Sequence, residues 1–198
     1  MNSNTKILLA IAGAFGIYEL YNYYQMSKAA DNALAFTNAE IENIVGDQKQ
    51  MNLQAFLRVL RQGESSQDPS AYAMKVGGGY FTDPNNPDWS KFPTNTYNKQ
   101  FNSDAAGAYQ IISPTWNTEI QPNLHLPDFS PDSQDKAAVF LISLRGAYDD
   151  VVNGNFTSAI NKLGVEWASL SSSPYGQPVQ TLAMEQKTFT DFGGEIVS

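Results

Sequence analysis

The chain has 198 residues, a formal net charge of −8 and a pI near 4.5, and it contains no basic cluster. This balance excludes a general nucleic-acid binder, because neutralising a phosphate backbone needs grouped Lys and Arg. With no cysteine and one histidine, His125, thiol nucleophiles and Cys- or His-based zinc sites are nearly excluded, and we expect neither a metal nor another cofactor.

The first predicted element is an apolar helix near the N-terminus. Residues 6–25, KILLAIAGAFGIYELYNYYQ, form an apolar run that ends in tyrosines, a pattern typical of a membrane span with interfacial aromatics. We therefore expect residues 1–25 to be a transmembrane anchor or signal anchor, with a cleaved signal peptide and a buried core helix as alternatives. Lys6 precedes the run, which favours a cytoplasmic tail and a domain facing the periplasm or cell wall.

The next segment, residues 26–50, is predicted to be a helical or flexible stalk. It is rich in Ala, Asn and acidic residues, and its apolar residues are too sparse to form a core. Residues 51–198 remain for a single domain, which is long enough to bury a core of its own.

An amphipathic helix opens this domain. Four apolar residues recur with the spacing i, i+3, i+4 and i+7, namely Leu53, Phe56, Leu57 and Leu60. Gly63 is a typical helix terminator, so we expect Glu64 directly at the helix exit.

The following segment is predicted to be an irregular lip. Residues 76–101, VGGGYFTDPNNPDWSKFPTNTYNKQF, are dense in Gly, Pro and Asn, which indicates turns and a small β-hairpin. The remainder of the chain reads as helices separated by loops. The predicted fold class is therefore α+β, a mainly helical domain with a β-hairpin lip beside a cleft.

Two of the later helices have clear start signals. Ser113-Pro114 and Ser130-Pro131 each place an N-cap hydroxyl before a proline, so helices should begin at about Pro114 and Pro131. The second of these has a broad apolar face and is expected to be the central core helix. Further helices are predicted from the segments FTSAINKL and QTLAMEQKTFTDF.

Six short motifs occur along the predicted domain. They are FLRVLRQGES around Glu64, VGGGYFTD from Val76, AGAYQI from Ala106, DFSPDSQDKAA from Asp128, LRGAY from Leu144, and EWASLSSSPYGQ from Glu166. In this order they resemble one known family, the lambda-type phage endolysins, which are lytic transglycosylases of the lysozyme-like superfamily. The resemblance runs from Leu53 to about Phe192, implies a lysozyme-like fold and leaves residues 1–50 unexplained.

The resemblance implies that Glu64 is the catalytic acid. In that family one glutamic acid protonates the glycosidic oxygen between N-acetylmuramic acid and N-acetylglucosamine, and then acts as a base while a 1,6-anhydro ring closes. The acid needs a raised pKa, which an apolar cleft supplies by desolvation, and we expect Tyr80, Tyr109 and Trp116 to wall this cleft. The residues before Glu64, Arg-Gln-Gly, are less apolar than the family pattern.

Other site assignments come from the same resemblance. Tyr109 and Gln110 match the Gly-x-Tyr-Gln positions that orient sugar, and packing beneath the cleft is the alternative for Tyr109. Tyr175 and Gln177 belong to a lip segment that either touches glycan or forms a surface turn. The residues expected to bind substrate are Ser65, Tyr80, Tyr109, Gln110, Tyr175 and Gln177.

Two other functions stay open at this point. A hydrolytic lysozyme would need a second carboxylate, and Asp68 and Asp83 are better explained as turn formers beside prolines. A non-catalytic glycan-binding protein of a virion or membrane would not need Glu64. The expected partners are peptidoglycan glycan strands, the membrane through residues 6–25, and virion or membrane proteins, but not nucleic acid. A phage protein for wall penetration or host lysis fits best.

Overall fold

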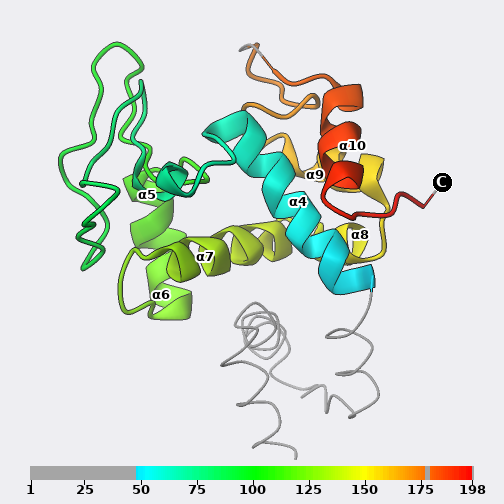
Figure 1. The fold of residues 1–198 in the computed structure, drawn as a ribbon, viewed down its shortest axis with the longest axis horizontal. Helices are drawn as coiled ribbons and strands as arrows, with labels where there is room; N and C mark the ends of the chain where they lie inside the picture. Colours follow the sequence, from blue (N-terminus) through cyan, green and yellow to red (C-terminus); the bar gives the residue numbers. More distant parts are fainter. Residues whose placement is uncertain (1–47, 177–178, 198) are drawn as a thin grey trace, which may run out of the picture.

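The computed structural model describes residues 48–176 and 179–197, and helices dominate this part of the chain (Figure 1). The long helix α4 crosses the middle of the molecule in Figure 1, with α7 beside it and α10 on its far side. The elements are α4 (Gln48–Glu64), the 3-10 helix η1 (Pro69–Ala73), α5 (Ser113–Thr115), the π-helix η2 (Trp116–Ile120), α6 (Gln121–Leu124), α7 (Pro131–Leu144), α8 (Tyr148–Val152), α9 (Phe156–Leu163) and α10 (Leu182–Asp191).

Helix α4 forms one side of the core, as its apolar spacing predicts. Leu53, Phe56, Leu57 and Leu60 are all buried, and α4 packs against α8 and α10. The ring of Phe56 lies 5.8 Å from that of Phe156 in α9 and 6.4 Å from that of Phe189 in α10, measured between centroids. These aromatic contacts join three helices that are far apart in the sequence.

Hydrogen bonds tie the C-terminal segment to the beginning of α4. Gln48 Nε2 donates to the Gly193 carbonyl at 2.6 Å. The buried Asn52 side chain donates to the Val152 carbonyl at 3.0 Å and accepts from the Glu195 backbone N–H at 2.8 Å. The segment after α10 is thereby fixed against the first turns of α4.

Gly63 does not end α4, contrary to the sequence prediction. The helix continues to Glu64, and a Cβ atom at Gly63 would collide with Ser169 Oγ and Gln180 Nε2. The glycine is therefore required by close packing against the segment of residues 169–180, and not by a left-handed cap.

Helix α7 is the central core helix that its apolar face predicts. It begins at Pro131, and Ser130 caps it by accepting a hydrogen bond from the Ser133 backbone N–H. Ala138, Leu141 and Ile142 are almost fully buried.

The helical run after residue 112 begins one residue before the predicted start, and Ser113 does not cap it. Its hydroxyl instead donates to the carboxylate of Asp104. Trp116 is buried, with its ring centroid 5.6 Å from that of Phe92 and 4.9 Å from that of Phe129, so it belongs to the core and is not a wall of the cleft.

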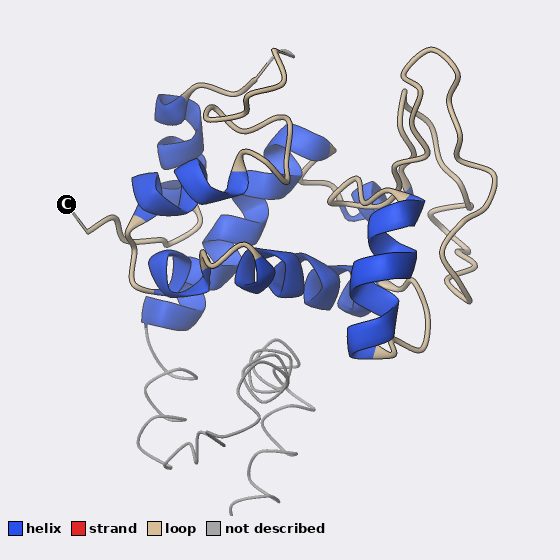
Figure 2. Cartoon of the chain, turned by 180° about the vertical axis from the view of Figure 1, so that it is seen from behind, coloured by secondary structure: helices blue, strands red, loops and turns tan. Residues whose placement is uncertain are grey.

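The predicted β-hairpin is wrong for the described residues. Residues 75–104 form a projecting loop without a strand, and Figure 2 shows only loops and helices. The isolated pairs that do form include Met74 with Tyr80 and Asn98 with Ser103. Three consecutive glycines, Gly77 to Gly79, have positive φ, and the prolines that follow lack an N–H, so no two segments stay extended long enough to pair.

The predicted anchor of residues 1–25 and nearly all of the predicted stalk lie outside the described residues. Within residues 48–176 and 179–197, no helix has the length and apolar character needed to cross a membrane.

Candidate active site

Glu64 is the last residue of α4, and its side chain is only partly exposed. Its Oε1 atom accepts a hydrogen bond from Ser169 Oγ at 2.6 Å and a longer one from the Ser169 backbone N–H at 3.4 Å. Burial raises the pKa of Glu64, and the two hydrogen bonds from Ser169 oppose this shift because they stabilise the charged carboxylate. The pKa of Glu64 is thus raised although polar residues precede it in the sequence.

Ser169 was not identified from the sequence, although it lies within the motif EWASLSSSPYGQ. Its backbone carbonyl accepts from the Gln180 N–H at 2.8 Å, and two residues earlier Trp167 Nε1 donates to the Tyr109 carbonyl at 3.2 Å. Trp167 is buried. These two hydrogen bonds hold the segment that carries Ser169 in place beside Glu64.

The turn of residues 106–111 lies beside Glu64. Ser65 Oγ donates to the Ala108 carbonyl at 2.7 Å, which joins the residue after the acid to this turn. Gly107 has a φ of +80°, and a Cβ atom there would collide with the side chain of Gln134. Ser65 is therefore bonded to the backbone of this turn, and its contact with substrate stays a prediction.

The side chain of Gln134 in α7 is hydrogen-bonded to the same turn. Its Oε1 accepts from the Ala108 N–H at 2.8 Å, and its Nε2 donates to the carbonyls of Tyr72 at 3.0 Å and Phe129 at 2.9 Å. The side chain is buried and all of these bonds are internal. Sequence reasoning included Gln134 in a motif but did not assign it a role.

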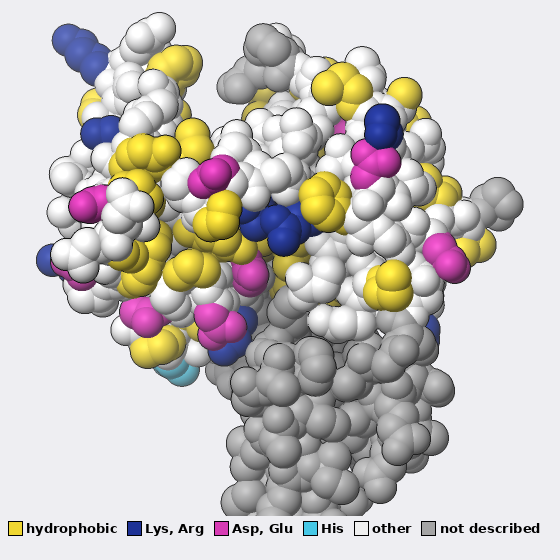
Figure 3. Space-filling view, in the orientation of Figure 1, with side chains coloured by type: hydrophobic (Ala, Val, Ile, Leu, Met, Phe, Trp, Pro, Cys, Tyr) yellow, Lys and Arg dark blue, Asp and Glu magenta, His cyan; other side chains and the backbone are white. Residues whose placement is uncertain are grey.

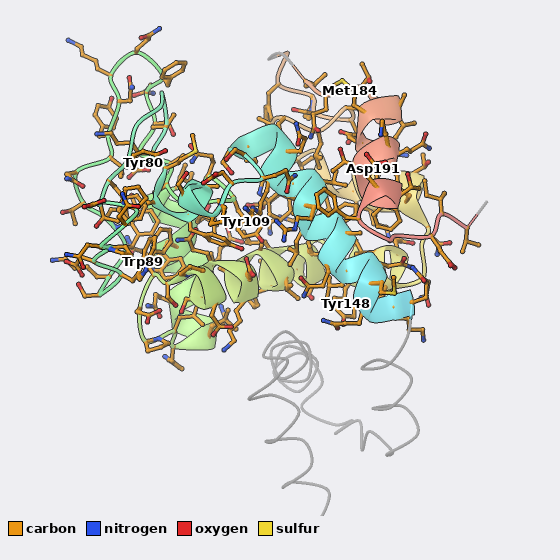
Figure 4. The ribbon with its side chains drawn as sticks, in the orientation of Figure 1. Tyr80, Trp89, Tyr109, Tyr148, Met184 and Asp191 are labelled. Carbon is orange, nitrogen blue, oxygen red and sulfur yellow. The ribbon has the colours of Figure 1, made fainter. Side chains whose placement is uncertain are left out.

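The side chain of Tyr109 is buried and hydrogen-bonded within the domain. It is only 1 % exposed, and its hydroxyl donates to Asp135 Oδ1 at 2.6 Å. Tyr72 donates to the same oxygen at 2.8 Å, and the Arg61 guanidinium lies 4.7 Å from the centroid of the Tyr72 ring. The Tyr109 side chain is thus packed in the interior, near the middle of the molecule in Figure 4.

Burial is the largest cause of the pKa shifts of Tyr72, Tyr109 and Asp135. It raises the pKa of Asp135, although hydrogen bonds from both tyrosines oppose the shift. The pKa of Tyr72 is raised to about 12 by burial and by the neighbouring Asp135. Each tyrosine therefore remains a neutral donor in the physiological pH range.

A pocket of about 300 Å³ adjoins the turn. Gln110, Arg145, Glu166 and Tyr175 are among its lining residues. Glu64 does not line it, but Trp167 and Tyr109 do, and these two residues neighbour the Ser169 and Ala108 contacts described above. The pocket is thus an extension of the site, and Figure 3 shows the surface notched between the projecting loop and the helical body.

The remaining predicted site residues lie on the projecting loop and around the pocket. Tyr80 is exposed on the projecting loop, with its hydroxyl 3.2 Å from Ser70 Oγ (Figure 4). Gln110 has a left-handed φ of +46° and donates through Nε2 to the Gly107 carbonyl. Tyr175 is exposed at the pocket, and its hydroxyl donates to the Val165 carbonyl. Gln177 lies outside the described residues.

No group of three His, Cys, Asp or Glu side chains within residues 48–176 and 179–197 could hold a metal ion.

This arrangement defines the class of the protein, a lysozyme-like domain with its acid at the end of a core helix. Its fold is similar to bacteriophage lambda lysozyme complexed with a chitohexasaccharide, with a TM-score of 0.66, 32 % identity, and coverage of 74 % of this chain and 97 % of that one. A second lambda lysozyme structure has a TM-score of 0.63 and 31 % identity, with the same coverage of both chains.

The family model named Endolysin matches residues 54–196, and the chain belongs to the endolysin family. It is 39 % identical over 108 residues to the endolysin of Escherichia phage lambda, covering 54 % of this chain and 65 % of that one. It is 38 % identical over 103 residues to the endolysin of Escherichia phage P2, covering 52 % and 62 %. The aligned segments thus span slightly less than two thirds of these relatives.

Replacing Tyr109 by phenylalanine tests its buried position. The variant removes one of two tyrosine donors from the buried Asp135, so the free energy of unfolding should fall by about 1–3 kcal/mol. Tyr175→Phe is the matched control and should change it by less than about 0.5 kcal/mol, because that hydroxyl is at the surface. Urea denaturation measures both; unchanged stability together with a raised KM would instead place the Tyr109 hydroxyl on the substrate.

The raised pKa of Glu64 also has a consequence for stability. Below the ordinary glutamate pKa the group is protonated in both folded and unfolded chains, and as the pH rises toward the folded pKa the unfolded chain loses its proton first. The folded state is therefore destabilised progressively up to that pKa. We expect Glu64→Gln to raise Tm at pH 8 more than at pH 4, measured by calorimetry; an equal change at both pH values would contradict this.

Proposed function

We propose that the protein degrades peptidoglycan as a lytic transglycosylase, cutting the β-1,4 bond between N-acetylmuramic acid and N-acetylglucosamine. Membership of the endolysin family and the similarity to a lysozyme complexed with a chitohexasaccharide support a glycan substrate. The observation that carries the proposal is the environment of Glu64, a carboxyl group whose pKa is raised by burial and whose neighbour Ser65 is bonded to the turn that lines the pocket.

The other carboxylates near the site already have structural partners. Asp68 caps η1 by accepting from the Ser70 N–H at 2.8 Å, and Asp83 accepts from the Asn85 N–H at 2.9 Å. Glu166 is paired with Arg145, with Oε2 and Nη2 2.5 Å apart. Retaining and inverting hydrolases normally use a pair of carboxylates, and the engagement of Asp68, Asp83 and Glu166 with these partners favours transglycosylation.

The proposed reaction needs only Glu64 as a proton carrier. The protonated acid gives its proton to the glycosidic oxygen while the bond from that oxygen to C1 of muramic acid breaks. The resulting carboxylate then takes the proton of the muramic 6-hydroxyl, and O6 bonds to C1. Glu64 is regenerated in its protonated form, and no water is consumed.

Gln110 and Tyr175 are proposed to contact the glycan in the adjacent pocket, with Tyr80 on the opposite lip. Gln110 and Tyr175 line the same pocket, and both tyrosines expose about half of their surface. Exposed tyrosines suit carbohydrate, since the ring face packs on the sugar and the hydroxyl stays hydrated.

Mass spectrometry of fragments released from purified peptidoglycan tests the mechanism. The full-length protein should release fragments that end in anhydromuramic acid, and Glu64→Gln should release at least roughly a hundredfold fewer, because the amide cannot donate the catalytic proton. Glu195→Gln is the matched control, since it makes the same substitution at an exposed position and should keep full activity.

The alternatives give different products in the same experiment. Fragments with reducing ends would show that water, and not O6, attacks C1, as in a hydrolytic lysozyme. The absence of fragments from a folded protein would favour a non-catalytic glycan-binding function.

We also propose that residues 1–25 hold the domain at the membrane, facing the periplasm or cell wall, in a phage protein that serves wall penetration or host lysis. A tether raises the local concentration of an acidic enzyme near a polyanionic wall without net charge attraction. Virion or membrane proteins would be additional partners in this setting.

Deleting residues 1–25 tests the tether. The shortened protein should lose membrane association and degrade the wall of expressing cells more slowly, while its activity on dissolved glycan fragments stays the same. Cell fractionation and turbidity measure the two effects; unchanged wall degradation at equal protein level would contradict the proposal.

A further inference from the structure

Ser169 and Glu64 form an asymmetric contact in which both donors reach one oxygen. The Ser169 hydroxyl and backbone N–H both donate to Oε1, at 2.6 and 3.4 Å. No described residue donates a hydrogen bond to Oε2. The two oxygens of the acid are therefore not equivalent.

We propose that Ser169 is a positioning residue that fixes Oε1 of Glu64 as the carbonyl oxygen and thereby places the catalytic proton on Oε2. In a protonated carboxyl group the carbonyl oxygen is the better hydrogen-bond acceptor, while the hydroxyl oxygen carries the only donor. Two donors on Oε1 therefore favour the acid whose O–H bond is on Oε2. This inference rests on the proposed function, in which Glu64 is the proton donor.

The assignment defines the path of the proton. Oε2–H gives its proton to the glycosidic oxygen, and Oε2 later accepts the proton of the muramic 6-hydroxyl. Throughout, Ser169 keeps its two hydrogen bonds to Oε1 and exchanges no proton. The same contact stabilises the transient carboxylate, which limits how far burial can raise the pKa.

The position of Ser169 is fixed before the acid reacts. Its carbonyl is bound by the Gln180 N–H, and Gly63 leaves the space in which its side chain approaches α4. Such preorganisation matters because small displacements of a catalytic group cost large factors in rate.

The chain contains a matched pair of contacts that separates positioning from stability. Two residues further on, Ser171 donates its N–H and hydroxyl to Glu185 at 2.7 and 2.6 Å. Glu185 is fully buried in α10, and it lines none of the pockets described above. Ser169 and Ser171 therefore each donate an N–H and a hydroxyl to a carboxylate, Ser169 to one oxygen and Ser171 to both. Only the first carboxylate is proposed to react.

The test compares Ser169→Ala, Ser169→Thr and Ser171→Ala in the full-length protein, together with Glu64→Gln. The ¹³C NMR signal of the Glu64 side-chain carboxyl, assigned by its loss in Glu64→Gln, is followed against pH. Ser169→Ala removes a donor to the carboxylate, so Glu64 should titrate at higher pH than in the wild type. The threonine variant should restore the wild-type titration, and Ser171→Ala should not change it.

Activity gives the second readout. In Ser169→Ala, kcat/KM should fall roughly tenfold to a hundredfold through loss of positioning. The alkaline limb of its pH profile should move to higher pH, because the acid keeps its proton longer. Ser171→Ala should lower Tm and leave the position of this limb unchanged.

The proposal is overturned if Glu64 titrates identically in Ser169→Ala and the wild type, or if Ser171→Ala shifts the alkaline limb equally. Failure of the proposed function has a different signature, namely activity retained by Glu64→Gln. The NMR titration does not depend on catalysis, so it decides the role of Ser169 in either case.

Discussion

The buried side-chain amide of Gln134 is the contact on which the geometry of the site depends. It bonds the turn of residues 106–111, the end of η1 and the loop before α7, and each partner is a backbone group that needs a hydrogen bond when it is buried. Gly107 leaves the space that this amide occupies. An apolar residue of the same size would leave three backbone groups unpaired, so the turn that Ser65 joins to Glu64 would lose its fixed position.

Three carboxylates of the domain, Glu64, Asp135 and Glu185, differ in the hydrogen-bond donors that their oxygens receive. Asp135 receives two tyrosine hydroxyls, and Glu185 receives the N–H and hydroxyl of Ser171, one on each oxygen. Glu64 receives donors from Ser169 on Oε1 alone. Burial raises the pKa of all three. Among the described residues Oε2 of Glu64 receives no donor, so it is the oxygen proposed to carry the catalytic proton.

Local patterns predicted the helices well, because spacing and capping act within a few residues. The stripe of α4 and the cap at Ser130 are examples, and Glu64 was placed at the helix exit for the same reason. Contacts between distant segments were not predictable in this way. Ser169 is 105 residues from Glu64, the hydroxyl of Ser113 is taken by Asp104, and Tyr109 turns inward because Asp135 is buried beside it. The β-hairpin failed because dense glycine and proline indicate turns but do not supply extended segments to pair.

The hydrogen bonds from Gln48 and Asn52 to the C-terminal segment also have a mechanical consequence. Chain that precedes α4 enters the domain at the end of the helix opposite Glu64, about 25 Å away for 17 residues. Any pull from that side acts first on the bonds to Gly193, Val152 and Glu195, which would have to shear together. Tension applied from that side therefore acts on the hydrogen bonds at the first turns of α4 before it reaches Glu64 at the other end.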